Sequence, residues 1–205
     1  LESLLNDNEI ERANQFISQQ DRATFIVAHA LKRKRIAEKL GSYNPSQLNF
    51  LADKTTGKPY LLDAGIHFNI SHSHGMAALA ISEVSECSVD IEVHRNINQL
   101  SLLIKTTMTE HEQNEIQASS SSLIAFLDRW VVKEAFLKLS GIGLAEPLSS
   151  ICVESELTGF KTDYGMLRGN TLFFKRGQDY SLAASSNAAI GFSLERSSDG
   201  SLEAV

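Results

Sequence analysis

Apolar side chains recur along this chain at two periods, one typical of helices and the other typical of strands. From Arg22 to Leu40 apolar and basic residues alternate at helical spacing, and Gly41 follows as a stop signal. A second helical pattern covers residues 100–116 and another covers about 123–139, with a serine-rich connection at 118–122. We therefore predict long helices in these segments.

Strand-like segments lie between and after these helices. They occur at residues 66–71, 76–82 and 87–93, and the tight polar connection at 83–86 predicts a hairpin between the last two. A turn pattern precedes them at residues 55–59. The tail is again strand-like at residues 151–153, 172–175, 180–184 and 190–194. The sequence thus predicts an α+β fold.

The two ends of this pattern resemble each other. Residues 76–92 read as a hairpin that ends on an acid, and residues 180–195 repeat that layout in nearly the same length. Each half also offers a helix before its hairpin. We interpret the chain as two similar α+β halves, residues 1–96 and 97–205, packed as a pseudo-dimer. The cleft between such halves is a usual place for a ligand.

Composition narrows the class of protein. The 205 residues are 42% hydrophobic, which suffices for a core, and no apolar run approaches the roughly 20 residues that span a bilayer. The net charge of -6 argues against a nucleic-acid binder, which would carry a basic field. We interpret the one dense basic run, residues 32–35, as the solvent-facing side of a helix.

The cysteines and the amino-terminal residues bear on the compartment. Cys87 and Cys152 form no close metal-type pair and do not suggest a disulfide framework. Residues 1–10 carry several acids and lack a secretory pattern. We expect a protein of the reducing cytoplasm.

Two acids on the strand at 87–93 offer the first candidate chemistry. Asp90 and Glu92 are two residues apart, so both carboxylates leave the same face of the strand. Like charges 4 Å apart repel by about 4 kcal/mol at an effective dielectric of 20, and a divalent cation removes that repulsion. Ligands that are all oxygen favour Mg²⁺ or Mn²⁺ over zinc. The alternative is a pair of solvated acids on a half-buried strand.

Other candidate residues have equally plain alternatives. Glu134 and Lys138 lie one helical turn apart, which is also the spacing of an exposed ion pair. Ser71 and His72 close a strand, where a histidine can be structural. His72, His74 and Asp90 together would suit a zinc hydrolase, although the acid that the metallohydrolase pattern requires two residues later is absent.

The joint pattern is far more specific than its parts. Four motifs occur in order: Gly57-Lys58-Pro59, Asn69-Ile70-Ser71-His72-Ser73, Val89-Asp90-Ile91-Glu92 and Trp130-x-x-Lys133-Glu134-Ala135-x-x-Lys138. Together they resemble the 4'-phosphopantetheinyl transferase family, of the larger, pseudo-dimeric type that activates peptide synthetases. The resemblance covers about residues 22–144.

The resemblance implies an activity and its partners. The family transfers 4'-phosphopantetheine from coenzyme A to a serine of an apo acyl or peptidyl carrier protein and releases 3',5'-ADP. Coenzyme A would bind in the cleft between two similar halves. We expect a monomer, because one chain would supply both walls of the cleft. The basic run at 32–35 is a candidate docking patch for acidic carrier proteins.

The resemblance also implies roles for individual residues. Asp90, Glu92 and Glu134 would be the magnesium ligands, and Glu134, or a water that it holds, would take the proton of the incoming serine. Lys138 would bind the phosphates and offset charge on the leaving group. The remaining coenzyme-binding positions would be Arg22, Lys58, Ser71 and His72.

One departure and one rival accompany this resemblance. Family members often carry two basic residues ahead of the first helix, whereas only Arg12 lies near that place here. The rival is a non-catalytic relative that binds coenzyme A or a carrier protein. The complete set of acids with Lys138 favours the enzyme, since a non-catalytic relative would not need that set.

Overall fold

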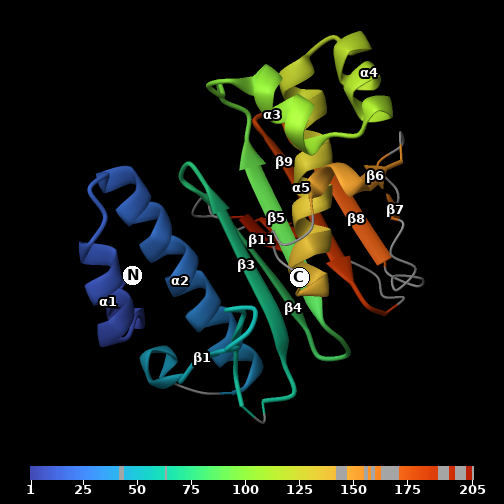
Figure 1. The fold of residues 1–205 in the computed structure, drawn as a ribbon. Coiled ribbons are helices and arrows are strands. Elements are labelled where there is room, and N and C mark those ends of the chain that lie inside the picture. The colour runs from blue at the N-terminus through green and yellow to red at the C-terminus, as the bar shows by residue number, and fades with distance from the viewer. Residues whose placement is uncertain are drawn as a thin grey trace. The chain divides into compact units, whose positions relative to one another are not determined.

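The structure is a computed structural model that describes residues 1–41, 44–62, 64–141, 147–154, 157, 160–162, 171–188, 194–196 and 202–204. The chain divides into two compact units, one formed by Leu1–Cys87 with Gly191–Val205 and the other by Ser88–Ile190. Each unit combines helices with β-structure (Figure 1), so the predicted α+β class is confirmed. The division at residues 96 and 97 and the internal repeat stay predictions.

The first unit is built from a long helix on a two-stranded antiparallel sheet. Its elements are η1 (Glu2–Leu4), α1 (Asp7–Asn14), α2 (Gln19–Lys39), η2 (Pro45–Gln47), β1 (Leu51–Ala52), β2 (Pro59–Tyr60), β3 (His67–Ser73) and β4 (Met76–Ser82), with β10 (Leu194–Arg196) and β11 (Leu202–Ala204) from the end of the chain. Ser18 caps α2 by accepting a hydrogen bond from the Asp21 amide, and Gly41 follows the helix with φ at 65°. The predicted helix at 22–40 is therefore confirmed.

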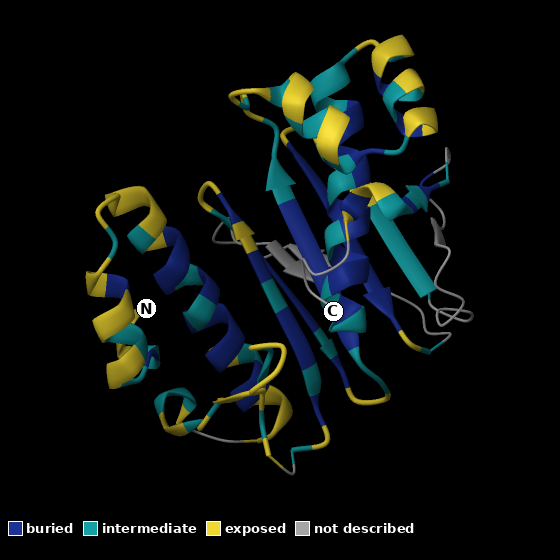
Figure 2. Cartoon of the chain, in the orientation of Figure 1, coloured by how far each residue is buried: buried dark blue, intermediate teal, exposed yellow. Residues whose placement is uncertain are grey.

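The core of the first unit lies between α2 and the β3–β4 hairpin. It contains Ala28, Leu31, Ile36, Phe68, Ala77 and Leu79. The hairpin pairs His67 with Ser82 at one end and Ser73 with Met76 at the other. His74 and Gly75 form its turn, both with positive φ. Figure 2 shows that most of the middle of α2 is buried.

The basic run at 32–35 is only in part the solvated helix face that the sequence predicted. The exposed fractions of Lys32 and Arg33 are 3% and 1%. Lys32 Nζ lies 2.9 Å from Glu9 Oε1, and Arg33 Nε also donates to Glu9. Arg33 Nη1 donates to the carbonyls of Pro45 and Leu48 at 2.8 and 2.9 Å. The interpretation was wrong for Lys32 and Arg33, because partners on α1 and beside η2 offset the desolvation of these two cations, whereas Lys34 is exposed and Arg35 is half-buried.

The second unit places helices against a three-stranded sheet. Its elements are β5 (Cys87–Val93), α3 (Leu100–Thr107), α4 (Glu110–Ala118), α5 (Ser122–Ser140), η4 (Leu148–Ser150), β6 (Ile151–Val153), β7 (Phe160–Thr162), β8 (Thr171–Arg176) and β9 (Tyr180–Ser186). The sheet has the strand order β5-β9-β8, and β6 pairs with β7. Helix α5 packs on the sheet through a core of Val131, Val132, Ala135, Val153, Leu157 and Ala183.

The structure differs from two predictions about these segments, and a third falls largely outside the described residues. The helix predicted at 100–116 is two helices, because Thr109 caps α4 and its side chain bonds the Glu112 amide. The predicted hairpin of 76–82 with 87–93 is wrong, since β4 pairs with β3 and β5 lies beside β9. Most of the strand predicted at 190–194 lies outside the described residues. Beyond it, β10 (Leu194–Arg196) pairs with β11 (Leu202–Ala204).

Both cysteines are free thiols. Burial raises the pKa of the Cys87 thiol to about 12, and the side chain is 2% exposed. Among the helices of the described residues, none combines the length and the apolar character that crossing a bilayer requires.

We predict that Glu9→Gln destabilises the first unit strongly. The change leaves the buried cations Lys32 and Arg33 without their counter-charge, which costs about 3 kcal/mol in the free energy of unfolding. Urea denaturation at pH 7 measures this loss. Glu38→Gln is the matched control, because Glu38 pairs with Arg35 at the surface of α2, the helix that carries Lys32 and Arg33. This change should alter the free energy of unfolding by less than about 1 kcal/mol.

The loss should depend on pH with a definite sign. Burial alone would raise the pKa of Glu9, but hydrogen bonds from His29, Lys32 and Arg33 and the charge of Lys32 outweigh it and hold the pKa far below its ordinary value of 4.5. The stabilisation by Glu9 is therefore present above pH 4.5 and declines as the pH falls further. A difference between wild type and Glu9→Gln that grows on acidification would contradict this account.

Candidate functional site

The predicted metal-binding and catalytic residues all lie in the second unit, on β5 and α5. Asp90 and Glu92 follow each other on one face of β5, and Glu134 and Lys138 follow each other on one side of α5. Asp90 is 4% exposed, whereas the other three side chains are half-buried. A buried aspartate on a strand is unfavourable unless a neighbouring group offsets its charge.

Two contacts, one helical turn apart, fix β5 against α5. Ser88 Oγ donates to the Ala135 carbonyl at 2.5 Å, and Lys138 Nζ donates to Asp90 Oδ1 at 2.6 Å. Lys138 Nζ also lies 3.3 Å from the Val89 carbonyl. Because Ser88 and Asp90 point to the same face of the strand, these contacts set the register of strand and helix. The structure thus brings Asp90 and Lys138 together.

The acids of this site act on one another electrostatically. Burial raises the pKa of Glu134, and the negative charge of Asp90 raises it further. The ammonium of Lys138 lowers the pKa in part, and the charge of Glu92 again raises it. A carboxylate in this environment holds a proton more readily than one in water. Glu134 is therefore suited to accept a proton.

The donor set of this site fits a hard divalent cation in its chemistry. All the candidate ligands are carboxylate oxygens, and the charges of Asp90 and Glu92 both disfavour ionised Glu134, a repulsion that a cation relieves. As the side chains stand, no group of three or more His, Cys, Asp or Glu residues within the described part of the chain is arranged to hold a metal ion. This finding applies equally to the magnesium ligands and to the alternative zinc set.

Two predicted coenzyme-binding cations lie in the first unit and have acidic neighbours there. Arg22 Nη2 lies 2.7 Å from Glu2 Oε1 and 3.2 Å from Asn14 Oδ1. Lys58 Nζ donates to Glu86 Oε2, and His67 Nδ1 lies 2.8 Å from Glu86 Oε1. An anion that binds Lys58 would therefore compete with the Glu86 carboxylate.

The other two predicted coenzyme-binding residues are neighbours on β3. Ser71 is buried and lies opposite Ala78, whereas His72 is exposed and lies opposite Ala77. Successive strand residues face opposite sides of a sheet, so only one of the two side chains can face a given ligand directly. His74, of the alternative zinc set, sits in the turn that follows.

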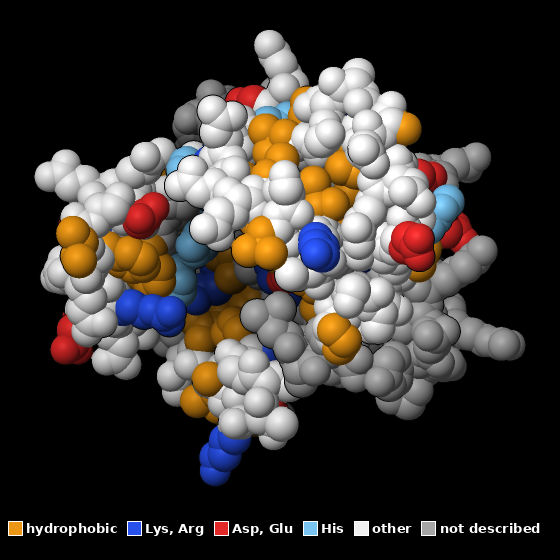
Figure 3. Space-filling model, turned by 45° about the horizontal axis from the view of Figure 1, so that its top comes forward, with side chains coloured by type: hydrophobic (Ala, Val, Ile, Leu, Met, Phe, Trp, Pro, Cys, Tyr) orange, Lys and Arg blue, Asp and Glu red, His pale blue; other side chains and the backbone are white. Residues whose placement is uncertain are grey.

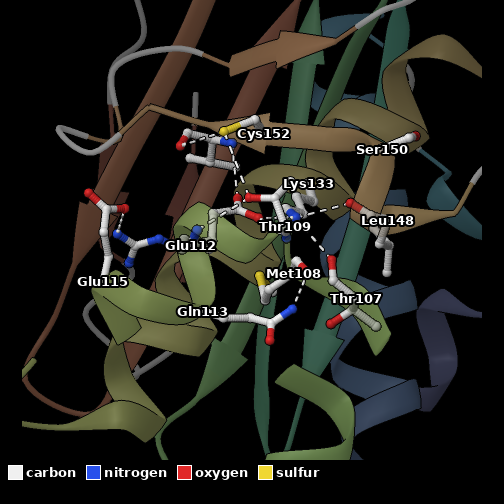
Figure 4. A network of polar contacts seen from close by, with 12 residues as sticks. Thr107, Met108, Thr109, Glu112, Gln113, Glu115, Lys133, Leu148, Ser150 and Cys152 are labelled. Carbon is white, nitrogen blue, oxygen red and sulfur yellow. Dashed lines mark hydrogen bonds and ion pairs between the residues drawn. The ribbon is translucent and has the colours of Figure 1, made fainter. Parts of the chain in front are cut away.

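Sequence reasoning missed a buried ion pair beside Glu134. Lys133 Nζ lies 2.6 Å from Glu112 Oε2, and both side chains have an exposed fraction of 0%. Figure 4 shows this pair with the backbone groups around it. A signal was present, because Thr109-x-x-Glu112 is the capping-box pattern and Lys133 belongs to one of the four motifs.

Two models of known protein families match successive parts of the chain. A model described as "4'-phosphopantetheinyl transferase, N-terminal" matches residues 1–84, and one described as "4'-phosphopantetheinyl transferase superfamily" matches residues 86–186. The chain belongs to the 4'-phosphopantetheinyl transferase superfamily. The separate match of an N-terminal model supports the larger type that the motifs predicted, so the predicted family is confirmed.

Curated relatives agree with this assignment. The 4'-phosphopantetheinyl transferase HetI of Nostoc sp. is 30% identical over 71% of the chain and 63% of its own length. The human L-aminoadipate-semialdehyde dehydrogenase-phosphopantetheinyl transferase is 27% identical over 85% of the chain and 60% of its own length. The 4'-phosphopantetheinyl transferase gsp of Aneurinibacillus migulanus is 30% identical over 70% of the chain and 59% of its own length. The chain thus spans about 60% of the length of these relatives.

We predict that Ser88→Ala loosens β5 from α5. The variant loses a buried hydrogen bond to the Ala135 carbonyl, which should lower the free energy of unfolding by about 1 kcal/mol. The shift of the urea midpoint at unchanged m-value measures it. Ser150→Ala is the control, because that hydroxyl donates to the Pro147 carbonyl at the surface. Equal effects of the two changes would contradict the proposed part of Ser88 in the register.

Proposed function

We propose that this protein transfers 4'-phosphopantetheine from coenzyme A to a serine of an apo acyl or peptidyl carrier protein. The observation that carries the proposal is the ion pair of Asp90 on β5 with Lys138 on α5, one helical turn from Glu134, whose pKa the charge of Asp90 raises, in a chain from this superfamily. The curated relatives bear the names of phosphopantetheinyl transferases, which supports the same reaction here.

The side chains of the second unit have distinct parts in the proposed reaction. The serine oxygen forms a bond to the phosphorus nearest pantetheine, and the bond from that phosphorus to the 3',5'-ADP oxygen breaks. Glu134, whose pKa burial and Asp90 raise, accepts the serine proton. Lys138 offsets the negative charge that develops on the departing 3',5'-ADP. Its position against Asp90 holds the ammonium group at the site.

Magnesium belongs to this proposal, with manganese as an alternative ion. Asp90, Glu92 and Glu134 would hold the ion, since their oxygens are the ligands that it prefers. When bound, the ion would neutralise charge on the pyrophosphate, and phosphoryl transfer depends mainly on such neutralisation and on positioning.

Coenzyme A would be bound through four residues of the first unit together with Lys138 of the second unit. Arg22 and Lys58 supply positive charge for its phosphates, and Ser71 and His72 supply hydrogen-bonding groups. A pseudo-dimer of two similar halves, with coenzyme A in the cleft and a monomeric chain in the cytoplasm, completes the proposal. We expect the adenosine end of coenzyme A to be bound more weakly than the family pattern implies. Arg12 is the one basic residue near the place where family members often carry two.

Only Lys34 and Arg35 of the basic run at 32–35 are open enough to meet a carrier protein, so the docking surface would extend beyond that run. Lys32 and Arg33 of that run are buried, so they cannot face an acidic carrier. The face in Figure 3 shows apolar side chains gathered in patches between small groups of charged ones. Exposed large apolar residues include Ile17, Leu62 and Leu102. Apolar contact would suit an acidic enzyme that meets acidic carriers.

A direct assay tests the proposed function. The protein is incubated with coenzyme A, magnesium and a panel of apo carrier proteins, and each carrier is examined by mass spectrometry for added phosphopantetheine. We expect at least one carrier to gain that mass, and the gain to stop when EDTA removes the metal. Binding of coenzyme A without transfer, while a known transferase modifies the same panel, would favour the non-catalytic alternative.

The part of Glu134 is tested by Glu134→Gln. The amide keeps the volume of the side chain but cannot accept the serine proton, so kcat should fall by about 10²–10⁴-fold. Coenzyme A binding, measured by calorimetry, should change little, because the variant leaves the residues proposed to bind it unchanged. Glu110→Gln, at an exposed position in the first turn of α4, is the control. Near-normal turnover of Glu134→Gln would remove Glu134 from its proposed part.

A further inference from the structure

The buried pair of Lys133 and Glu112 adjoins the site but takes no part in the proposed chemistry. Lys133 precedes Glu134 on α5, and its ammonium is enclosed completely. Its three protons have three acceptors: Glu112 Oε2 at 2.6 Å, the Thr107 carbonyl at 2.9 Å and the Leu148 carbonyl at 3.0 Å. An ammonium group carries three donors, so its hydrogen-bonding capacity is filled.

Glu112 extends the same set of contacts to other elements (Figure 4). Its Oε2 accepts a hydrogen bond from the Thr109 amide at 2.7 Å, and its Oε1 accepts one from the Val153 amide at 3.0 Å. The pair therefore joins α5 to the end of α3, the start of α4, η4 and β6. Each of these contacts ends on a backbone group, which cannot turn away as a side chain can.

Stability alone does not account for this arrangement. A buried ion pair is on average no more stabilising than apolar residues of the same volume, because both charges lose their hydration. What the pair supplies is directional contact. The acceptors of Lys133 surround one end of the side chain, so α5 can neither slide nor rotate without breaking several hydrogen bonds at once.

A second set of contacts holds α5 at the same level from another side. Ser88 Oγ bonds the Ala135 carbonyl, and Asp90 bonds Lys138. Successive residues of a helix point about 100° apart, so Lys133 and Glu134 face different sides of α5. Glu134 thus lies between the contacts to β5 and the contacts of Lys133.

We propose that Lys133 and Glu112 are positioning residues, which fix the rotation and the axial place of α5 and thereby hold Glu134 beside Asp90. This inference rests on the proposed transferase function. Catalytic groups must stay within about 0.5 Å of their productive geometry, and a misplacement of about 1 Å can lower the rate about 10²-fold.

The chain offers a matched control pair on the same two helices. Arg129 lies one turn before Lys133 on α5, and its Nη2 lies 2.8 Å from Glu115 Oε2 on α4. This pair also joins α4 to α5, but its contacts lie farther along the helix from Glu134. Loss of the Arg129 pair should affect stability without a comparable effect on the chemical step.

The test compares the double variants Glu112→Gln/Lys133→Met and Glu115→Gln/Arg129→Met with wild type. Each change removes both charges of a pair, so neither leaves a lone buried ion. Tm is measured by calorimetry, and kcat and the KM for coenzyme A are measured well below the lowest Tm. We expect the first variant to lose about tenfold to a hundredfold in kcat with KM nearly unchanged, and the control to keep its kcat within about twofold.

Each outcome decides the inference. A folded Glu112→Gln/Lys133→Met protein with the kcat of wild type overturns it, as does an equal loss of kcat in the control. If the double variant does not fold, Lys133→Met alone carries the test with the same expected loss of kcat, since the Glu112 carboxyl group keeps its hydrogen bonds from the Thr109 and Val153 amides; failure of both to fold would make the pair a folding determinant only and reject the inference. Absence of transfer by wild type itself would instead reject the proposed function, and the inference with it.

Discussion

A buried ammonium group needs an acceptor for each of its protons, and in the second unit this need determines where several elements meet. Lys133 finds these acceptors in Glu112 and in the carbonyls of Thr107 and Leu148. The end of α3, the start of α4, the middle of α5 and η4 must therefore converge on one point. Helix α5 carries both Glu134 and Lys138, so the place of the candidate site follows from the same requirement.

The first unit meets a related need in a related way. Glu9 on α1 and Glu112 on α4 are both capping-box glutamates, and each also accepts a hydrogen bond from a buried cation on the long helix that follows. In both units a glutamate that caps the start of a short helix thus also binds that helix to a long one. This arrangement occurs once in each unit. It is a further resemblance between the two parts of the chain, beside the sequence pattern that predicted an internal repeat.

The candidate site depends on a balance of charge. Asp90 is nearly buried, and Lys138 offsets its charge. Burial raises the pKa of Glu134 and the charge of Asp90 raises it further, which suits a group that accepts a proton. A cation bound among these acids and the phosphates of coenzyme A would change this balance in the direction that ionises Glu134. The same acids could thus hold a metal ion and exchange a proton. Their negative charge is offset by the cation when it is bound, and by Lys138 and the proton on Glu134 when it is not.

The sequence by itself determined the family and the local elements of the site. Helical spacing and capping residues located α2 and α5, and period-two alternation placed Asp90 and Glu92 on one face of β5, because these patterns depend on neighbours along the chain. Only the tertiary structure decided that Lys32 and Arg33 are buried, that β4 and β5 belong to different sheets and that Lys133 meets Glu112. The ion pairs join residues 21 to 24 positions apart, Glu9 with Lys32 and Arg33 and Glu112 with Lys133, and β5 lies beside β9 from much later in the chain. From the sequence alone, a charged side chain is predicted to be solvated. Only the fold shows the partner that offsets its desolvation.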